Sequence, residues 1–111
     1  MLISNIQYYG RKSFTGIPVK VNAEGYFEDP NQWTKEMATE MAKDYNIVLT
    51  DKHFLVLEIL RNRQLTGEPL TIRKVGTSGI TNIKEFYQLF LGGPLKVSSK
   101  LAGIPKPTSC V

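Results

Sequence analysis

Residues 50–60 read Thr-Asp-Lys-His-Phe-Leu-Val-Leu-Glu-Ile-Leu, and this stretch decides the fold. Thr50 is a typical helix N-cap, and Asp51 carries the charge that the positive end of a helix dipole favours. The run over residues 54–60 is apolar on nearly every side, which is typical of a helix at the buried centre of a bundle. We therefore expect a helix over residues 53–65, and we expect it to be the least exposed element of the chain.

Helical signals continue on both sides of this stretch. A capping-box pattern begins at Asp29 and predicts a helix over residues 30–45. Its residues Trp33, Met37 and Met41 lie four apart, which is the pattern of a stripe that packs into a core. Three shorter helices are expected downstream, over residues 71–76, 82–91 and 95–102, and Gly103 ends the last of them.

The N-terminal part of the chain has the periodicity of a strand. Apolar residues alternate with polar ones over residues 17–22, residues 22–25 form a turn, and Tyr26 and Phe27 can return as a second strand. Residues 1–16 show no clear pattern and are treated as an N-terminal extension. The prediction is a single domain over residues 1–111, mainly α (α+β), with about five helices, an N-terminal β-hairpin and a flexible C-terminal arm.

Composition narrows the classes of function. The chain of 111 residues is long enough for one hydrophobic core, and its net charge of +4 permits binding to nucleic acids or acidic proteins without requiring either. It has no apolar run near the ~20 residues that span a bilayer, and its start lacks the pattern of a signal peptide. We expect a cytoplasmic protein that does not enter the membrane. One Cys and one His cannot supply the ligands of a metal site without carboxylates, so no metal and no cofactor are expected.

The last nine residues read Gly-Ile-Pro-Lys-Pro-Thr-Ser-Cys-Val, and they hold the only cysteine of the chain, Cys110. Two alternating prolines favour extended polyproline geometry, at roughly 3.1 Å per residue. Residues 103–111 are therefore expected to form a mobile arm that carries the thiol roughly 20 Å beyond the last helix. An accessible thiol on such an arm can enter the pocket of a partner protein, where it reacts as its thiolate.

The order of several short motifs resembles the DsrC/TusE family of sulfur-relay proteins. The resemblance covers roughly residues 19–111 and is strongest from Tyr87 onward. The motifs are Asn31-Gln32-Trp33, the stretch from Leu49 to His53, Ile72-Arg73, the stretch from Tyr87 to Phe90, Gly93-Pro94, Lys96, and the run from Lys100 to Val111. The resemblance implies protein partners that exchange sulfur.

In that family the cysteine that matches Cys110 carries or exchanges sulfur with partner proteins. The DsrC members that serve dissimilatory sulfite reductase have a second cysteine eleven residues upstream, where this chain has Ser99. With one thiol there is no internal disulfide, so the chain is expected to act as a persulfide carrier of the TusE kind. Whether that makes it an enzyme in its own right is left open.

The resemblance also implies the partners, which are a protein sulfur donor of the Tus or DsrEFH kind and a protein sulfur acceptor. Two basic residues, Arg73 and Lys96, are candidates to hold the arm or to meet an acidic partner. The candidates for partner docking on the arm itself are Gly103, Pro105, Lys106 and Pro107.

Two other classes of function remain open from sequence. Residues 72–91 have the length and the Gly-containing turn of a DNA-binding helix-turn-helix, but the second helix has Lys84 as its only basic residue, which disfavours DNA as the main partner. The chain could also be a non-catalytic gamma-type subunit associated with dissimilatory sulfite reductase. His53 is interpreted as a structural histidine. Ser98 and Ser99 lack the neighbours of a nucleophilic serine.

Overall fold

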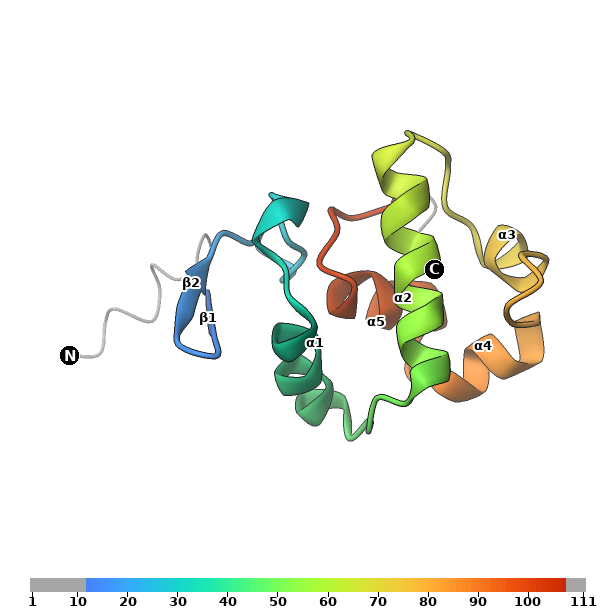
Figure 1. The fold of residues 1–111 in the computed structure, drawn as a ribbon, viewed down its shortest axis with the longest axis horizontal. Helices are drawn as coiled ribbons and strands as arrows, with labels where there is room; N and C mark the ends of the chain where they lie inside the picture. Colours follow the sequence, from blue (N-terminus) through green and yellow to red (C-terminus); the bar gives the residue numbers. More distant parts are fainter. Residues whose placement is uncertain (1–11, 108–111) are drawn as a thin grey trace.

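The computed structural model describes residues 12–107, in which five α-helices, two short strands and two 3₁₀ turns follow one another (Figure 1). The elements are β1 (Lys12–Phe14), β2 (Ile17–Val19), η2 (Pro30–Gln32), α1 (Lys35–Ala42), η3 (Lys43–Tyr45), α2 (Asp51–Leu65), α3 (Ile72–Gly76), α4 (Ile83–Leu89) and α5 (Pro94–Leu101). The helices α2 and α5 lie between α1 on one side and the α3–α4 pair on the other, with the two strands beyond α1. The predicted mainly helical fold is confirmed. None of the helices among these residues is long and apolar enough to cross a membrane.

The helix predicted over residues 30–45 is divided into three pieces. Asp29 caps the short turn η2, but the backbone of Thr34 is extended, and its side chain accepts a hydrogen bond from the Met37 N–H (3.3 Å). Thr34 is thus a second N-cap, which starts α1 afresh and makes the prediction of one continuous helix wrong. After α1 and η3, Asn46 ends the segment in the left-handed conformation, with a φ of 57°.

The β-hairpin lies earlier in the chain than predicted. The strands β1 and β2 pair antiparallel, with Phe14 opposite Ile17, and both residues of the turn between them have positive φ (Thr15 53° and Gly16 81°). A two-residue turn of this kind matches the twist of paired strands. The hairpin predicted over residues 17–27 is reduced to a single bridge between Val21 and Phe27.

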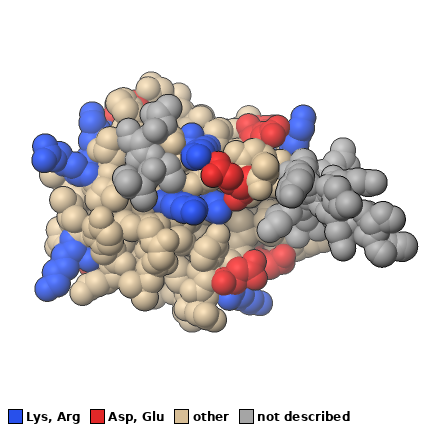
Figure 2. All heavy atoms as spheres, turned by 180° about the vertical axis from the view of Figure 1, so that it is seen from behind, with Lys and Arg blue, Asp and Glu red and all other residues tan. Residues whose placement is uncertain are grey.

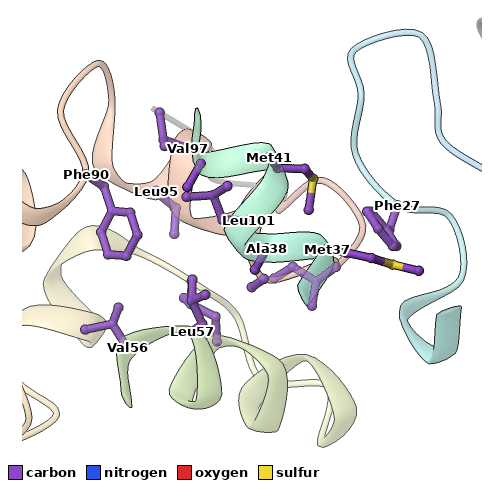
Figure 3. Close-up of a cluster of buried hydrophobic side chains, with 14 of the residues drawn as sticks. Phe27, Met37, Ala38, Met41, Val56, Leu57, Phe90, Leu95, Val97 and Leu101 are labelled. Atoms are coloured by element: carbon purple, nitrogen blue, oxygen red, sulfur yellow. The ribbon is translucent and has the colours of Figure 1, made fainter. Parts of the chain in front are cut away.

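The core lies between α1, α2 and α5, whose apolar side chains point toward one another in Figure 3. Six of the eight residues of α5 are buried, compared with four of the fifteen in α2. Leu55 and Leu65 in α2 are 45% and 68% exposed, so the prediction that α2 is the least exposed helix is wrong. The reason is geometric: α1, α2 and α4 all pack against α5, whereas α2 keeps one side toward solvent.

Candidate functional site

The C-terminal end of α5 is closed by a complete Schellman motif. The Gly103 N–H donates to the Lys100 carbonyl (3.1 Å), and the Ile104 N–H donates to the Ser99 carbonyl (3.3 Å). Gly103 takes the left-handed conformation that the motif requires, with a φ of 65°. The prediction that Gly103 ends the last helix is confirmed. The motif also sets the direction in which the following residues leave the helix.

Arg61 in α2 binds the carbonyl that follows α5. Its guanidinium donates to the Ala102 carbonyl (2.9 Å) and to the Pro30 carbonyl (3.0 Å). Burial lowers the pKa of the Arg61 guanidinium from its ordinary value, although an arginine remains protonated. One side chain thus ties the start of η2 to the end of α5.

Trp33 completes this arrangement from the other side. Its ring stacks on the Arg61 guanidinium at 4.3 Å, and its indole N–H donates to the Leu101 carbonyl (2.7 Å). The ring also lies directly against Gly103, where an added Cβ would stand 2.2 Å from the Trp33 Cδ1 atom. Three consecutive backbone positions at the end of α5 are therefore in contact with two side chains. We call Trp33 and Arg61 the clamp.

The residues after Gly103 continue along the body of the protein. Ile104 is fully buried (0% exposed), and Pro107 is also buried. Lys106 forms an ion pair with Glu24, with 2.8 Å between Nζ and Oε1. In Figure 1 this segment runs beside the C-terminal half of α2. A surface hollow of about 330 Å³ adjoins it, lined by Gln64, residues 67–70 and residues 105–107.

These contacts alter the expected start of the arm. The arm was predicted to leave the body at Gly103, but residues 103–107 pack against the body because Ile104 and Pro107 are apolar and find buried positions. The remaining residues of the predicted arm, including Cys110, lie outside the described residues. The role of Cys110 therefore stays a prediction, as does the mobility of the arm.

Charged side chains gather around the same segment. Glu24 is exposed, and its pKa is lowered by the hydrogen bond from Lys106 and by the charges of Lys106, Lys96 and Lys100. Figure 2 shows basic and acidic side chains next to one another on the face of the molecule opposite to that of Figure 1. Three lysine charges thus act on one glutamate in this region.

The structure brings together most of the predicted docking residues. Gly103, Pro105, Lys106 and Pro107 follow one another along the body, and the charge of Lys96 acts on the Glu24 carboxylate that holds Lys106. Arg73 is exposed on α3, and its described contacts stay within that helix and its C-cap. The structure therefore gives no support for grouping Arg73 with the arm.

Ser99 lies on the buried side of α5. It is 0% exposed, and its hydroxyl finds no hydrogen-bond partner among the described residues. The neighbouring Ser98 is also 0% exposed, but its hydroxyl donates to the Leu95 carbonyl (3.4 Å). A buried hydroxyl without a partner is destabilising, so the surroundings of Ser99 suit a less polar side chain better.

His53 has a structural role, as predicted. Its Nδ1 accepts from the Thr50 N–H (3.1 Å), its Nε2 lies 2.9 Å from the Leu89 carbonyl, and its ring meets Phe90 edge-on. Nδ1 thus helps to cap α2, and Nε2 holds α2 against the end of α4. Within residues 12–107, no group of three or more His, Cys, Asp and Glu side chains could hold a metal ion.

The pair α3–α4, which suggested a helix-turn-helix, presents a mixed surface. Ile83 and Tyr87 of α4 are 43% and 48% exposed, and Lys84 is the only basic residue in that helix. Glu85 pairs with Lys52 of α2 at 3.5 Å. Exposed apolar side chains and an acidic residue are poorly suited to contact phosphates, which disfavours DNA as a partner.

Sequence reasoning missed the roles of Trp33, Arg61 and Glu24. Trp33 was interpreted as part of a core stripe and of a family motif, and Arg61 was assigned no role. One signal was present for Arg61. It lies four residues after Leu57 and eight after His53, which places it on the buried side of α2. Glu24 offered no such signal, because its partner Lys106 is 82 residues away.

Comparison with known proteins gives the following matches. The family model described as "DsrC like protein" matches residues 13–111. A protein named Sulfurtransferase TusE from Pectobacterium atrosepticum is 31% identical over 107 residues, covering 88% of this chain and 97% of the relative. Sulfurtransferase TusE from Escherichia coli is 27% identical over 106 residues, with the same coverage of both chains.

Solved structures of similar proteins have the same fold. The oxidized gamma-subunit of the dissimilatory sulfite reductase (DsrC) from Archaeoglobus fulgidus superposes with a TM-score of 0.74 at 28% identity, covering 91% of this chain and 99% of that chain. DsrC from Allochromatium vinosum superposes with a TM-score of 0.73 at 33% identity, covering 91% and 97%.

Proposed function

Because the chain belongs to the DsrC-like protein family, we propose that it is a sulfur carrier of a sulfur relay, with Cys110 as the thiol that bears the sulfur. The observation that carries this proposal is the extent of the match. The family model reaches from residue 13 to residue 111 and so includes the stretch that contains Cys110. The relatives named Sulfurtransferase TusE are matched over 97% of their own length.

The chemistry needs only one thiol on this chain. The Cys110 thiolate attacks the outer sulfur of a persulfide on the donor protein, the donor's S–S bond breaks, and the donor's thiolate leaves. Cys110 then carries a persulfide, which is one of the reversible modifications of cysteine. In the second step an acceptor thiolate attacks the outer sulfur, and the Cys110 thiolate leaves. No net oxidation or reduction occurs, so the transfer requires no additional redox group.

Ser99 supports this assignment over chemistry that needs two thiols. Position 99 is buried in α5 and has a hydroxyl that cannot form a disulfide. Cys110 is the only cysteine, so an internal disulfide is ruled out for this chain. The partners in this proposal are a protein donor and a protein acceptor of sulfur. Transfer between thiols suits the cytoplasm, where cysteines remain reduced.

A second candidate is a subunit role beside a sulfite reductase. It is favoured by the likeness to the protein from Archaeoglobus fulgidus, whose title describes a gamma-subunit of dissimilatory sulfite reductase. A subunit of that kind could keep its function without a reactive Cys110. Loading of sulfur on that residue therefore distinguishes the two candidates.

The test is intact mass spectrometry after exposure to glutathione persulfide. The wild type should gain one sulfur atom that is removed by a reducing agent, and Cys110→Ser should gain none. Ser109→Ala is the matched control, because it changes the neighbouring residue and keeps the thiol, so it should load like the wild type. A wild type that gains no sulfur, or a Cys110→Ser variant that gains it, would refute the assignment of Cys110.

A further inference from the structure

Arg61 is hydrogen-bonded to backbone carbonyls, whereas a partly buried arginine is usually paired with a carboxylate. Its two described hydrogen bonds go to backbone carbonyls, those of Ala102 and Pro30, and it forms no ion pair with a carboxylate among the described residues. A partly buried guanidinium without a carboxylate is costly compared with an apolar side chain of similar size. Packing alone therefore does not account for an arginine at this position, whereas the need to hold two carbonyls does.

The glycine at the end of α5 fits the clamp equally closely. Any Cβ at Gly103 would overlap the Trp33 ring, with 2.2 Å to Cδ1 and 2.4 Å to Cγ. The Trp33 N–H meanwhile holds the Leu101 carbonyl at 2.7 Å. Each of the three positions 101–103 is consequently in contact with one group of the clamp. The Trp33 N–H binds the Leu101 carbonyl, the Arg61 guanidinium binds the Ala102 carbonyl, and the Trp33 ring lies against Gly103.

A second set of contacts follows immediately. Ile104 is fully buried, Lys106 pairs with Glu24, and Pro107 is buried. The ion pair is exposed and contributes little by itself. The clamp therefore sets the direction in which this segment starts, and the burial of Ile104 and Pro107 holds it against the body.

We propose that Trp33 and Arg61 are positioning residues that fix the point from which the sulfur-carrying segment leaves the body. The proposal rests on the proposed function, in which Cys110 bears the sulfur. Cys110 lies three residues after Pro107 and seven after Gly103. An extended chain spans at most ~3.3–3.6 Å per residue. While residues 104–107 stay packed on the body in the direction that the clamp sets, the thiol therefore reaches about 10 Å from Pro107, compared with about 25 Å from Gly103 if those residues were released.

This short reach has a consequence for partner proteins. A donor or acceptor must bring its reactive sulfur to within about 10 Å of Pro107. It must therefore contact the side of the molecule on which Gln64, Leu70 and residues 105–107 line the surface hollow. A held exit point also reduces the loss of conformational freedom when the segment enters a partner.

The test uses the single cysteine as a site for a nitroxide spin label in the full chain. The label broadens the NMR signals of nearby backbone amides. The rate of hydrogen exchange at the Gly103 and Ile104 amides measures how often the backbone opens at the end of α5. Two variants open the clamp conservatively. Arg61→Lys keeps the charge but loses the planar fork, and Trp33→Phe keeps a ring but loses the N–H donor. Arg63→Lys is the matched control, because Arg63 lies in the same helix and binds the Glu68 carboxylate instead.

In the wild type the broadening should be confined to amides around Pro107 and residues 64–70. In Arg61→Lys and Trp33→Phe it should spread to amides beyond that range, and exchange at Gly103 and Ile104 should rise by about tenfold, as expected for the loss of a hydrogen bond. Arg63→Lys should match the wild type in both measurements. Stability against urea should be measured for each variant, so that the broadening patterns are compared only between folded proteins.

Two results would overturn the proposal. One is a rise in exchange at Gly103 with no change in the broadening pattern, because the clamp would then not position the thiol. The other is no change in either measurement, because Trp33 and Arg61 would then not hold the backbone. If Arg61→Lys does not fold, Trp33→Phe decides alone. The label is attached to the Cys110 thiol in place of the outer sulfur of a persulfide. This result is therefore independent of whether Cys110 accepts a persulfide.

Discussion

Replacing Ser99 with alanine should stabilise this protein, although most substitutions in a core destabilise. The hydroxyl of Ser99 is buried at 0% exposure and has no hydrogen-bond partner among the described residues. Burying a hydroxyl without a partner costs about 1–3 kcal/mol in proteins. Alanine removes that cost, is a better helix former, and leaves a cavity of only one atom. We expect the free energy of unfolding to rise by about 1–2 kcal/mol.

The measurement is urea unfolding followed by circular dichroism, together with a thermal melt. For a domain of this size the expected gain corresponds to a rise in Tm of roughly 5 °C or more. Ser98→Ala is the matched control, since Ser98 is equally buried in the same helix but donates to the Leu95 carbonyl. It gains the same helix propensity and loses a hydrogen bond, so its stabilisation should be smaller. Ser99→Cys should also be stabilising, because cysteine behaves as a small hydrophobic residue when buried.

If Ser99→Ala unfolds at lower urea than the wild type, the hydroxyl must have a partner and the reasoning fails. A gain no larger than that of Ser98→Ala would also contradict it, because helix propensity would then explain the whole effect.

Two further predictions concern α2 and the segment after α5. Thr50→Ala removes the side-chain cap of α2 and should lower the free energy of unfolding by about 1 kcal/mol in urea, whereas Thr39→Ala, on an exposed position of α1, should change it little. Lys106 lowers the pKa of Glu24, so the stabilisation from their ion pair is present above the ordinary pKa of a glutamate and is lost as the pH falls through the lowered one. In an NMR titration Lys106→Met should raise the pKa of Glu24, while Lys20→Met should leave it unchanged; an unshifted Glu24 in Lys106→Met would contradict the ion pair.

The local parts of the fold follow from the sequence because they depend on neighbouring residues. The N-cap at Thr50, the stop at Asn46 and the C-terminal glycine at Gly103 each involve hydrogen bonds across a few positions. The structural role of His53 was also predicted, since its capping contact is local. Boundaries failed where two local signals competed. Thr34 outweighed the continuation of the helix that begins at Asp29, and the Thr15–Gly16 turn formed a hairpin before the one expected.

The sequence by itself also determined that this chain offers a single thiol, because it has one cysteine and Ser99 stands at position 99 wherever its segments lie. Only the tertiary structure decided the point at which residues 103–107 are held against the body. That point depends on Arg61 meeting Ala102 and on Trp33 meeting Leu101, contacts that span 41 and 68 residues of sequence. Such distant pairs come together because α1, α2 and α5 pack into one core, and no local pattern of residues records that outcome.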